Sequence, residues 1–179
     1  MTDAELLEKF ANPETRNYGF NLLVRKYQQK VYWLIRKMVI DHDDADDLTQ
    51  ETFIKVWLAL PNFRGDAQVY TWIYRIATNE CLNFLNKKKR RFFLPIGDIE
   101  NELSNKIDEE PGLSGDEIQL KLQKALLTLP DKQRLVFNMK YFEELKYDDI
   151  AEITGTSVGA LKASYHHAVK KIEDFLAKD

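Results

Sequence analysis

Residues 68 to 91 carry side chains that could read and hold nucleic acid. In a helical projection, one face of this stretch is polar but almost uncharged before its last turn. That face presents Gln68, Thr71, Arg75, Thr78, Asn79 and Asn86, with Trp72 at its flank. Amides and hydroxyls hydrogen-bond to base edges, rings stack on bases, and cations contact phosphates. The face therefore favours nucleic-acid binding, and the stretch ends in the cations Lys87, Lys88, Lys89, Arg90 and Arg91.

The opposite side of this helix predicts a packed core. Its apolar residues follow a turn at Arg64-Gly65-Asp66 and have helical spacing. They are Val69, Ile73, Ile76, Ala77, Cys81 and Phe84. Cys81 is the sole cysteine of the sequence, so it offers neither a disulfide nor a thiolate cluster for zinc. Its inward position predicts a small core residue rather than a nucleophile.

A preceding helix, expected over residues 44 to 60, presents a different surface. Its inward face is formed by Ala45, Leu48, Thr49, Thr52, Val56 and Leu60. Its outward face is formed by Asp47, Gln50, Glu51, Ile54 and Leu58, with Trp57 at the edge. An exposed apolar pair rimmed by carboxylates predicts a partner-binding face. The alternative is that these apolar residues are buried against another helix of the same module.

A basic amphipathic helix is expected before this one. Residues 15 to 40 carry six cations and no acid, whereas residues 41 to 51 carry six acids and no cation. This change of charge predicts two helices that attract each other, with Asp43 or Asp44 as the N-cap of the second.

The charges of the whole chain indicate two modules and a linker. The 179 residues have a net charge of −3, yet residues 1 to 91 sum to +3 and residues 92 to 117 to −7. The acidic segment also contains Pro95, Pro111 and three glycines, without a sustained helical period. We therefore expect an all-α protein with two small helical domains, residues 1–91 and 118–179, joined by a flexible acidic linker over residues 92–117.

The second module contains a helix-turn-helix pattern. One helix ends before Pro130, another begins at a predicted Asp131 cap, and a third ends at Gly155. Thr156 or Ser157 then caps a last helix. A tight turn containing glycine between two helices allows the second to enter the major groove.

The exposed side of this last helix favours DNA. No acid occurs from residue 154 to 172. The outward residues are Gly159, Ala160, Lys162, Ala163, Ser164, His166, His167, Lys170 and Lys171. The adjacent histidines point in different directions and are poor joint metal ligands, so they are better interpreted as hydrogen-bonding or phosphate contacts. A plain helical hairpin with a solvated face is the alternative.

Several classes of protein lack support in the sequence. No apolar run is long enough to span a membrane, and the acidic N-terminus does not resemble a secretion signal, so we expect a cytoplasmic protein without membrane contact. No Ser/His/Asp arrangement, metal cluster or Gly-rich phosphate loop is visible. We expect no enzymatic activity, no cofactor, no metal and no catalytic residue.

With these elements in order, the chain resembles an extracytoplasmic-function (ECF) sigma factor of bacterial RNA polymerase over nearly its full length. The specific motifs are DDADDLTQETFIKVWLAL, FRGDAQVYTWIYRIATNECLNFL, LPDKQRLVFNMKY and IAEITGTSVGALKASYHHAVKKI. The resemblance implies that the first domain binds the β′ coiled-coil of core polymerase, which also contacts the factor through its β subunit. The matching positions are Asp47, Gln50 and Glu51, on the face that also presents Ile54 and Leu58.

The resemblance also implies two contacts with promoter DNA. The −10 element is read as melted single strand by Phe63, Arg64, Gln68, Thr71, Trp72, Arg75 and Asn79, with the cations from Lys87 to Arg91 on the backbone. The −35 element is read as duplex by Ser157, Gly159, Lys162, Ala163, Ser164, His166, His167 and Lys170. Ser164 and His167 stand where the family pattern more often has arginine, which predicts weak or unusual −35 specificity. An anti-sigma factor is a further partner that the family implies, although no residue of the chain identifies it.

Two other functions are compatible with parts of the pattern. A helix-turn-helix regulator acting without polymerase predicts stable binding to duplex DNA by the protein alone. An adaptor that binds polymerase or an inhibitor without touching DNA predicts that Asn79→Ala leaves transcription unchanged.

Overall fold

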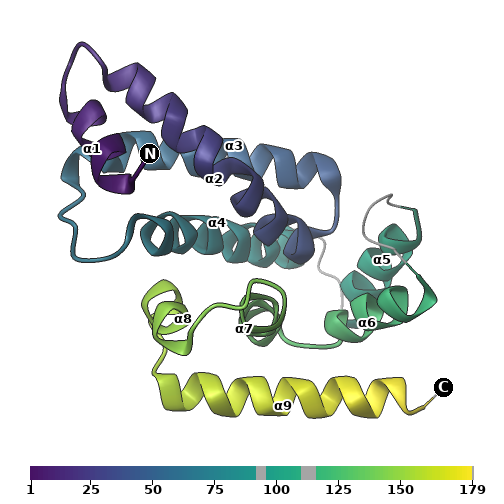
Figure 1. Ribbon diagram of the computed structural model, residues 1–179. Helices are drawn as coiled ribbons and strands as arrows, with labels where there is room; N and C mark the ends of the chain where they lie inside the picture. Colours follow the sequence, from purple (N-terminus) through teal and green to yellow (C-terminus); the bar gives the residue numbers. More distant parts are fainter. Residues whose placement is uncertain (92–95, 110–115, 179) are drawn as a thin grey trace.

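The computed structural model describes residues 1–91, 96–109 and 116–178, and over residues 96–100 it describes the backbone alone. Within these ranges the protein consists of nine α-helices and one short 3₁₀ helix, with no strand (Figure 1). The elements are α1 Asp3–Ala11, α2 Arg16–Val39, α3 His42–Ala59, η1 Leu60–Asn62, α4 Val69–Arg91, α5 Ile96–Glu109, α6 Glu117–Leu127, α7 Asp131–Tyr141, α8 Tyr147–Thr154 and α9 Val158–Leu176. The expected all-α fold with two helical parts is confirmed.

Helices α1 to α4 form the N-terminal lobe. Helix α1 begins with a capping box, in which the Thr2 hydroxyl accepts from the Glu5 amide and the Glu5 carboxylate accepts from the Thr2 amide. Helix α1 then lies closely against α2 at Gly19. A Cβ at this position would stand 2.8 Å from the Phe10 amide nitrogen, so the close approach of the two helices requires glycine.

The N-cap of α3 differs from the one expected from the sequence. The Asp41 carboxylate, rather than that of Asp43 or Asp44, caps α3 by accepting from the Asp44 amide at 3.0 Å. The preceding residue, Ile40, has φ 69°, a conformation rare for a β-branched residue, and its side chain is fully buried. Helix α3 is thus capped two or three residues earlier than the charge pattern suggested.

Helix α5 is the main difference from the sequence-based expectation. Its 14 residues, 96–109, lie within the segment expected to be a flexible linker. Leu103 and Ile107, one helical turn apart, are buried in a small cluster with Ile40 and Leu127. Two apolar residues at this spacing are enough for a helix that rests on neighbouring elements, although too few to stand out as a period among the surrounding prolines and glycines.

Helices α6 to α9 form the C-terminal lobe, whose helix-turn-helix geometry agrees with the prediction. Helix α8 ends at Gly155, which adopts a left-handed conformation with φ 70°, and Ser157 caps α9 by accepting from the Ala160 amide. The cap expected at Asp131 is wrong. Pro130 is the N-cap residue of α7, and Asp131 is the first residue inside the helix.

The two lobes pack on each other. In Figure 1, α4 lies between α2 and α3 above and α7 and α8 below, while α9 lies at the far side of the C-terminal lobe. One buried apolar cluster includes Ile73 and Cys81 of α4 together with Leu135 of α7, Ile150 of α8 and Leu161 of α9. The lobes therefore share one apolar cluster, while a separate cluster lies among α6, α7 and α9 of the C-terminal lobe.

Candidate nucleic-acid interface

The polar face of α4 is open to solvent at four of the six expected positions. Gln68, immediately before the helix, and Arg75, Asn79 and Asn86 within it are exposed at spacings of seven, four and seven residues, so they lie along one side of the helix. Trp72 is half-buried beside them, with its ring centroid 4.9 Å from that of Phe63. The two rings form an apolar edge next to hydrogen-bonding side chains, an arrangement suited to holding an unstacked base.

Two residues expected on this face are buried instead. Thr71 is 1% exposed and Thr78 is 2% exposed, and their hydroxyls donate to the carbonyl oxygens of Gln68 and Arg75 in the preceding turn. The expectation assumed that α4 has a single inward face. Because α2 and α3 cover one side of α4 and α7 and α8 cover another, a wider arc of the helix is excluded from water.

The loop before α4 positions the remaining expected contacts of this site. Gly65 has φ 77°, which a residue with a side chain rarely adopts, so glycine allows the chain to turn between η1 and α4. The turn leaves Arg64 exposed and Phe63 half-buried against Trp72. A cation and a ring thus stand at the N-terminal end of the α4 face.

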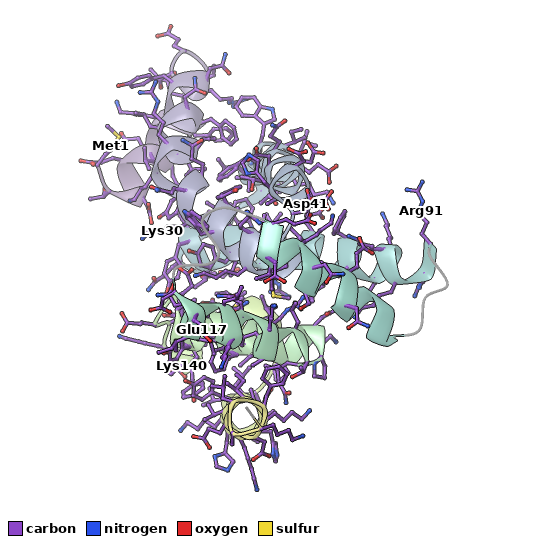
Figure 2. All side chains as sticks on the ribbon, turned by 90° about the vertical axis from the view of Figure 1, so that its right-hand side faces the viewer. Met1, Lys30, Asp41, Arg91, Glu117 and Lys140 are labelled. Carbon is purple, nitrogen blue, oxygen red and sulfur yellow. The ribbon has the colours of Figure 1, made fainter. Side chains whose placement is uncertain are left out.

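The five cations at the end of α4 do not have equal surroundings. Lys87, Arg90 and Arg91 are exposed, and Figure 2 shows Arg91 projecting from the end of the helix. Lys89 pairs with Asp131 of α7. The Lys88 side chain is 12% exposed, with its Nζ 3.5 Å from Glu102 Oε1 of α5. Two of the five are therefore engaged by carboxylates of other elements.

The outward face expected on α3 is present, and its apolar residues are exposed to solvent. Ile54 is 60% exposed and Leu58 is 68% exposed, and Asp47, Gln50 and Glu51 are exposed with them. A groove of about 440 Å³ runs beside this face and is lined by Phe20, Val24, Gln28, Thr49, Gln50, Phe53, Ile54 and Trp57. The alternative that Ile54 and Leu58 are buried within the lobe is wrong.

The outward face of α9 lies on the side of the C-terminal lobe away from α4. All nine expected outward residues are exposed except Ser164, which is half-buried. In Figure 2, α9 is the yellow helix seen end-on at the bottom, with side chains radiating into solvent. The Lys162 ammonium lies 5.8 Å from the ring centroid of Tyr147, so the aromatic side chain of α8 helps to orient it.

Burial changes the acidity of groups where α4 meets the C-terminal lobe. Desolvation, followed by a hydrogen bond with Asp149 of α8, raises the pKa of Tyr70. Desolvation and the charge of Glu143 raise the pKa of Tyr74. Burial, opposed in part by the charge of Arg134, raises the pKa of the Cys81 thiol to about 12. At neutral pH this thiol is protonated and poorly nucleophilic, as the sequence analysis predicted for a core residue.

Contacts between the lobes were missed by sequence reasoning. Arg134 is 2% exposed, and its Nη2 donates to the carbonyl oxygen of Met38 at 2.9 Å. Lys37 pairs with Glu143 at 3.4 Å. A run of charged residues on an amphipathic helix gives no signal of which charge will meet a distant element, so these pairs depend on the tertiary arrangement.

Two absences bear on the class of site. Within residues 1–91, 96–109 and 116–178, no cluster of at least three His, Cys, Asp or Glu side chains is placed to hold a metal ion. Across those same ranges, every helix is too short or too polar to cross a lipid bilayer.

Comparison with known proteins assigns both lobes to one family. Residues 23–91 match the family described as Sigma-70 region 2, and residues 119–172 match Sigma-70, region 4. The RNA polymerase sigma-H factor of Pseudomonas aeruginosa is 35% identical over 97% of this chain and 93% of its own length. The ECF RNA polymerase sigma-E factor of Escherichia coli K12 is 32% identical over 97% of this chain and 94% of its own length.

Two solved structures share the fold. CnrH in complex with the cytosolic domain of CnrY superposes with a TM-score of 0.72, covering 99% of this chain and 98% of that one. The sigma factor RpoE in complex with the anti-sigma factor NepR from Bartonella quintana gives a TM-score of 0.69, with coverage of 89% and 98%. Each is 22% identical to this chain, a level at which the likeness concerns the fold.

The class defined by the fold, the two regions and the relatives is that of bacterial sigma factors. The chain belongs to the sigma-70 family and is an ECF-type sigma factor. It directs promoter-specific initiation of transcription, and a helix-turn-helix regulator unconnected with polymerase is not favoured.

Proposed function

We propose that three separate surfaces divide the work of this sigma factor. The α3 face, defined by Asp47, Gln50, Glu51, Ile54 and Leu58, binds core RNA polymerase. The exposed face of α4, with the loop before it and the cations after it, binds the −10 element as melted single strand. The exposed face of α9 binds the −35 element as duplex.

The observation that carries the −10 assignment is the exposed line formed by Gln68, just before α4, and by Arg75 and Asn79 of α4, beside the Phe63–Trp72 ring pair. These groups can stack on a base and hydrogen-bond to its edge only when that base has left the duplex. Stacking contributes about 1–3 kcal/mol per base, comparable with the few kcal/mol needed to unstack and flip one. Base capture can therefore favour strand opening without a nucleotide cofactor.

The surface on α3 supports the assignment to polymerase. Burying one Ile or Leu side chain that is otherwise exposed stabilises a complex by about 1.5–3 kcal/mol. The carboxylates around these residues would select a partner with a basic surface, because like charges repel. A basic helical element of polymerase that places apolar residues on Ile54 and Leu58 meets both requirements.

An anti-sigma factor is the further partner that we propose. Two sigma factors of the same fold have been solved as complexes, RpoE with the anti-sigma factor NepR and CnrH with the cytosolic domain of CnrY. The CnrH structure matches 99% of this chain, so both lobes are included in the likeness.

Run-off transcription with purified core polymerase tests the −10 assignment. Asn79→Ala should substantially lower the yield of transcript from a duplex promoter. It should also lower the yield from the same promoter with its −10 region already unpaired, because the amide contacts the unpaired base on both templates. Asn17→Ala, at an exposed amide of α2, is the matched control. Unchanged transcription by Asn79→Ala on both templates would favour an adaptor that does not touch the −10 element.

A further inference from the structure

Helix α5 holds an acidic segment beside the cationic end of α4. Its apolar residues Leu103, 3% exposed, and Ile107, 0% exposed, pack with Ile40 at the end of α2 and Leu127 of α6. The helix is thus attached to both lobes by buried side chains, and its position does not depend on surface charge alone.

A groove of about 470 Å³ separates α5 from the end of α4. It is lined by the cations Lys87, Lys88, Arg91 and Lys106 and by the carboxylates of Asp44 and Glu102. A groove with this excess of cations and this size can accept a phosphate group of a nucleic-acid backbone.

Glu102 is paired with the Lys88 ammonium, the group that such a phosphate would contact. Its Oε1 lies 3.5 Å from Lys88 Nζ and 4.0 Å from Lys106 Nζ. Lys106 in turn donates to Asp41 Oδ2 at 3.0 Å, and these carboxylates raise the pKa of Lys106 even though burial opposes its charge. The acidic helix is therefore fixed by charges at both the α4 end and the α2–α3 turn.

The charge of the surrounding segment has the sign needed for competition with DNA. Residues 92 to 117 sum to −7, whereas residues 87 to 91 are five consecutive cations. We propose that α5 competes with DNA inside the molecule, keeping Lys88 and its groove from the phosphate backbone while α5 remains docked. This inference rests on the proposed role of the α4 cations in binding the backbone.

The consequence is that the free protein binds DNA less tightly than its exposed surfaces allow. The Glu102 carboxylate neutralises the Lys88 ammonium and repels a backbone phosphate that approaches the same group. Nucleic acid therefore gains little from Lys88 while Glu102 is paired with it, and a factor that detaches α5 raises the affinity of the cationic end.

The test uses the full chain and a fluorescently labelled single-stranded oligonucleotide of mixed sequence, with affinity measured by anisotropy across a range of salt concentrations. Glu102→Gln should raise the affinity about two- to five-fold, the range typical of one partly exposed ion pair. It should also steepen the dependence of log affinity on log salt by about 0.7, corresponding to one additional phosphate contact on a single strand. Unchanged affinity and slope would overturn the inference.

A control separates the local contact from net charge. Glu117→Gln removes the same unit charge from an 85% exposed side chain on α6, where Glu117 pairs with Lys121 of its own helix. It should leave the affinity unchanged, and an increase equal to that of Glu102→Gln would overturn the inference. Leu103→Ser, which loosens the whole helix without adding charge, should raise the affinity about ten-fold if circular dichroism shows the remaining helices intact; if it does not fold, the Glu102→Gln comparison decides alone.

Lys88→Gln distinguishes this inference from the proposed function. If Lys88→Gln weakens promoter binding by the complex with core polymerase and Glu102→Gln does not strengthen binding by the free chain, competition by α5 is wrong and the role of the α4 cations stands. If Lys88→Gln leaves promoter binding unchanged in that complex, the assigned role of this cation fails. In the Lys88→Gln background, Glu102→Gln should have a smaller effect than in the unsubstituted chain, the remainder coming from Lys106, whose Nζ lies 4.0 Å from Glu102 Oε1.

Discussion

The guanidinium of Arg134 in α7 donates to the main-chain carbonyl oxygen of Met38 in α2, 96 positions away along the chain. Met38 lies in the last turn of α2, where carbonyl groups lack a partner within the helix. A cation at this end also interacts favourably with the helix dipole. One buried side chain of the C-terminal lobe therefore supplies a hydrogen-bond donor to the C-terminal end of a helix of the N-terminal lobe.

Arg134→Ala should destabilise the protein by about 2 kcal/mol, because a hydrogen bond from a charged donor is lost in a buried site. Urea unfolding followed by circular dichroism measures this change. Lys132→Ala, at an exposed cation of the same helix, should change the free energy of unfolding by less than about 0.5 kcal/mol. Equal effects of the two substitutions would show that the contact between the lobes contributes nothing in solution.

Two buried tyrosines and one half-buried tyrosine predict a loss of stability at alkaline pH. Desolvation raises the pKa of Tyr27, Tyr70 and Tyr74 above the ordinary value of 10.0, with Asp3, Asp149 and Glu143 respectively adding to the effect. A phenol whose folded pKa is raised contributes stability that is fully present below the unfolded pKa and is lost as pH rises toward the folded pKa. The free energy of unfolding should therefore fall as pH rises above about 10.

Urea titrations at a series of pH values, together with the ultraviolet absorbance of tyrosinate, measure this dependence. Replacing Tyr74 by Phe should make the fall of stability with pH shallower, because one protonated phenol is removed from the folded state. Tyr141→Phe, at a ring that is 53% exposed, is the control. The assignment would be contradicted if Tyr74→Phe left the pH dependence as steep as in the unsubstituted protein.

Ile54→Asp should weaken assembly with core polymerase at least about ten-fold, since it removes an apolar contact and adds a charge that requires desolvation in the interface. The free energy of unfolding should change by less than about 0.5 kcal/mol, because the side chain is already exposed. Fluorescence titration of labelled sigma factor with core enzyme measures the affinity. Tyr18→Asp, at another large exposed side chain of the N-terminal lobe, should leave the affinity unchanged.

His167→Arg should sharpen recognition of the −35 element. His167 is exposed on α9, and arginine at this position would carry a permanent charge and could donate two hydrogen bonds to guanine. Selection of bound sites from randomised duplexes with the polymerase complex should show a new preference for guanine. Identical preferences for both proteins would mean that position 167 does not face the bases.

Local features of the sequence predicted local features of the structure. The apolar pair Ile54 and Leu58 could be placed outward because α3 has one packed side, which its projection defines. Gly155 and Ser157 mark the turn before α9 because a left-handed residue and a helix cap each need particular residue types. These conclusions required no knowledge of distant contacts.

Features that depend on distant contacts were missed. Thr71 and Thr78 are buried because α4 is covered on more than one side, which a projection of one helix cannot show. Helix α5 owes its place to contacts of Leu103 and Ile107 with Ile40 and Leu127, which come from two other parts of the chain. The same limit applies to Arg134, whose acceptor is a main-chain oxygen of another lobe.

The position of the lone cysteine gives the closed arrangement a built-in chemical reporter. Cys81 is 2% exposed within the core that both lobes share, and the charges of Arg134 and Asp131 in α7 act on its thiol. Separating α7 from α4 would admit solvent to a sulfur atom that is otherwise shielded. A maleimide or a disulfide reagent would modify Cys81 faster when the lobes separate. The rate of this reaction, measured on the protein alone and with polymerase, would therefore report how often the lobes separate, without any engineered probe.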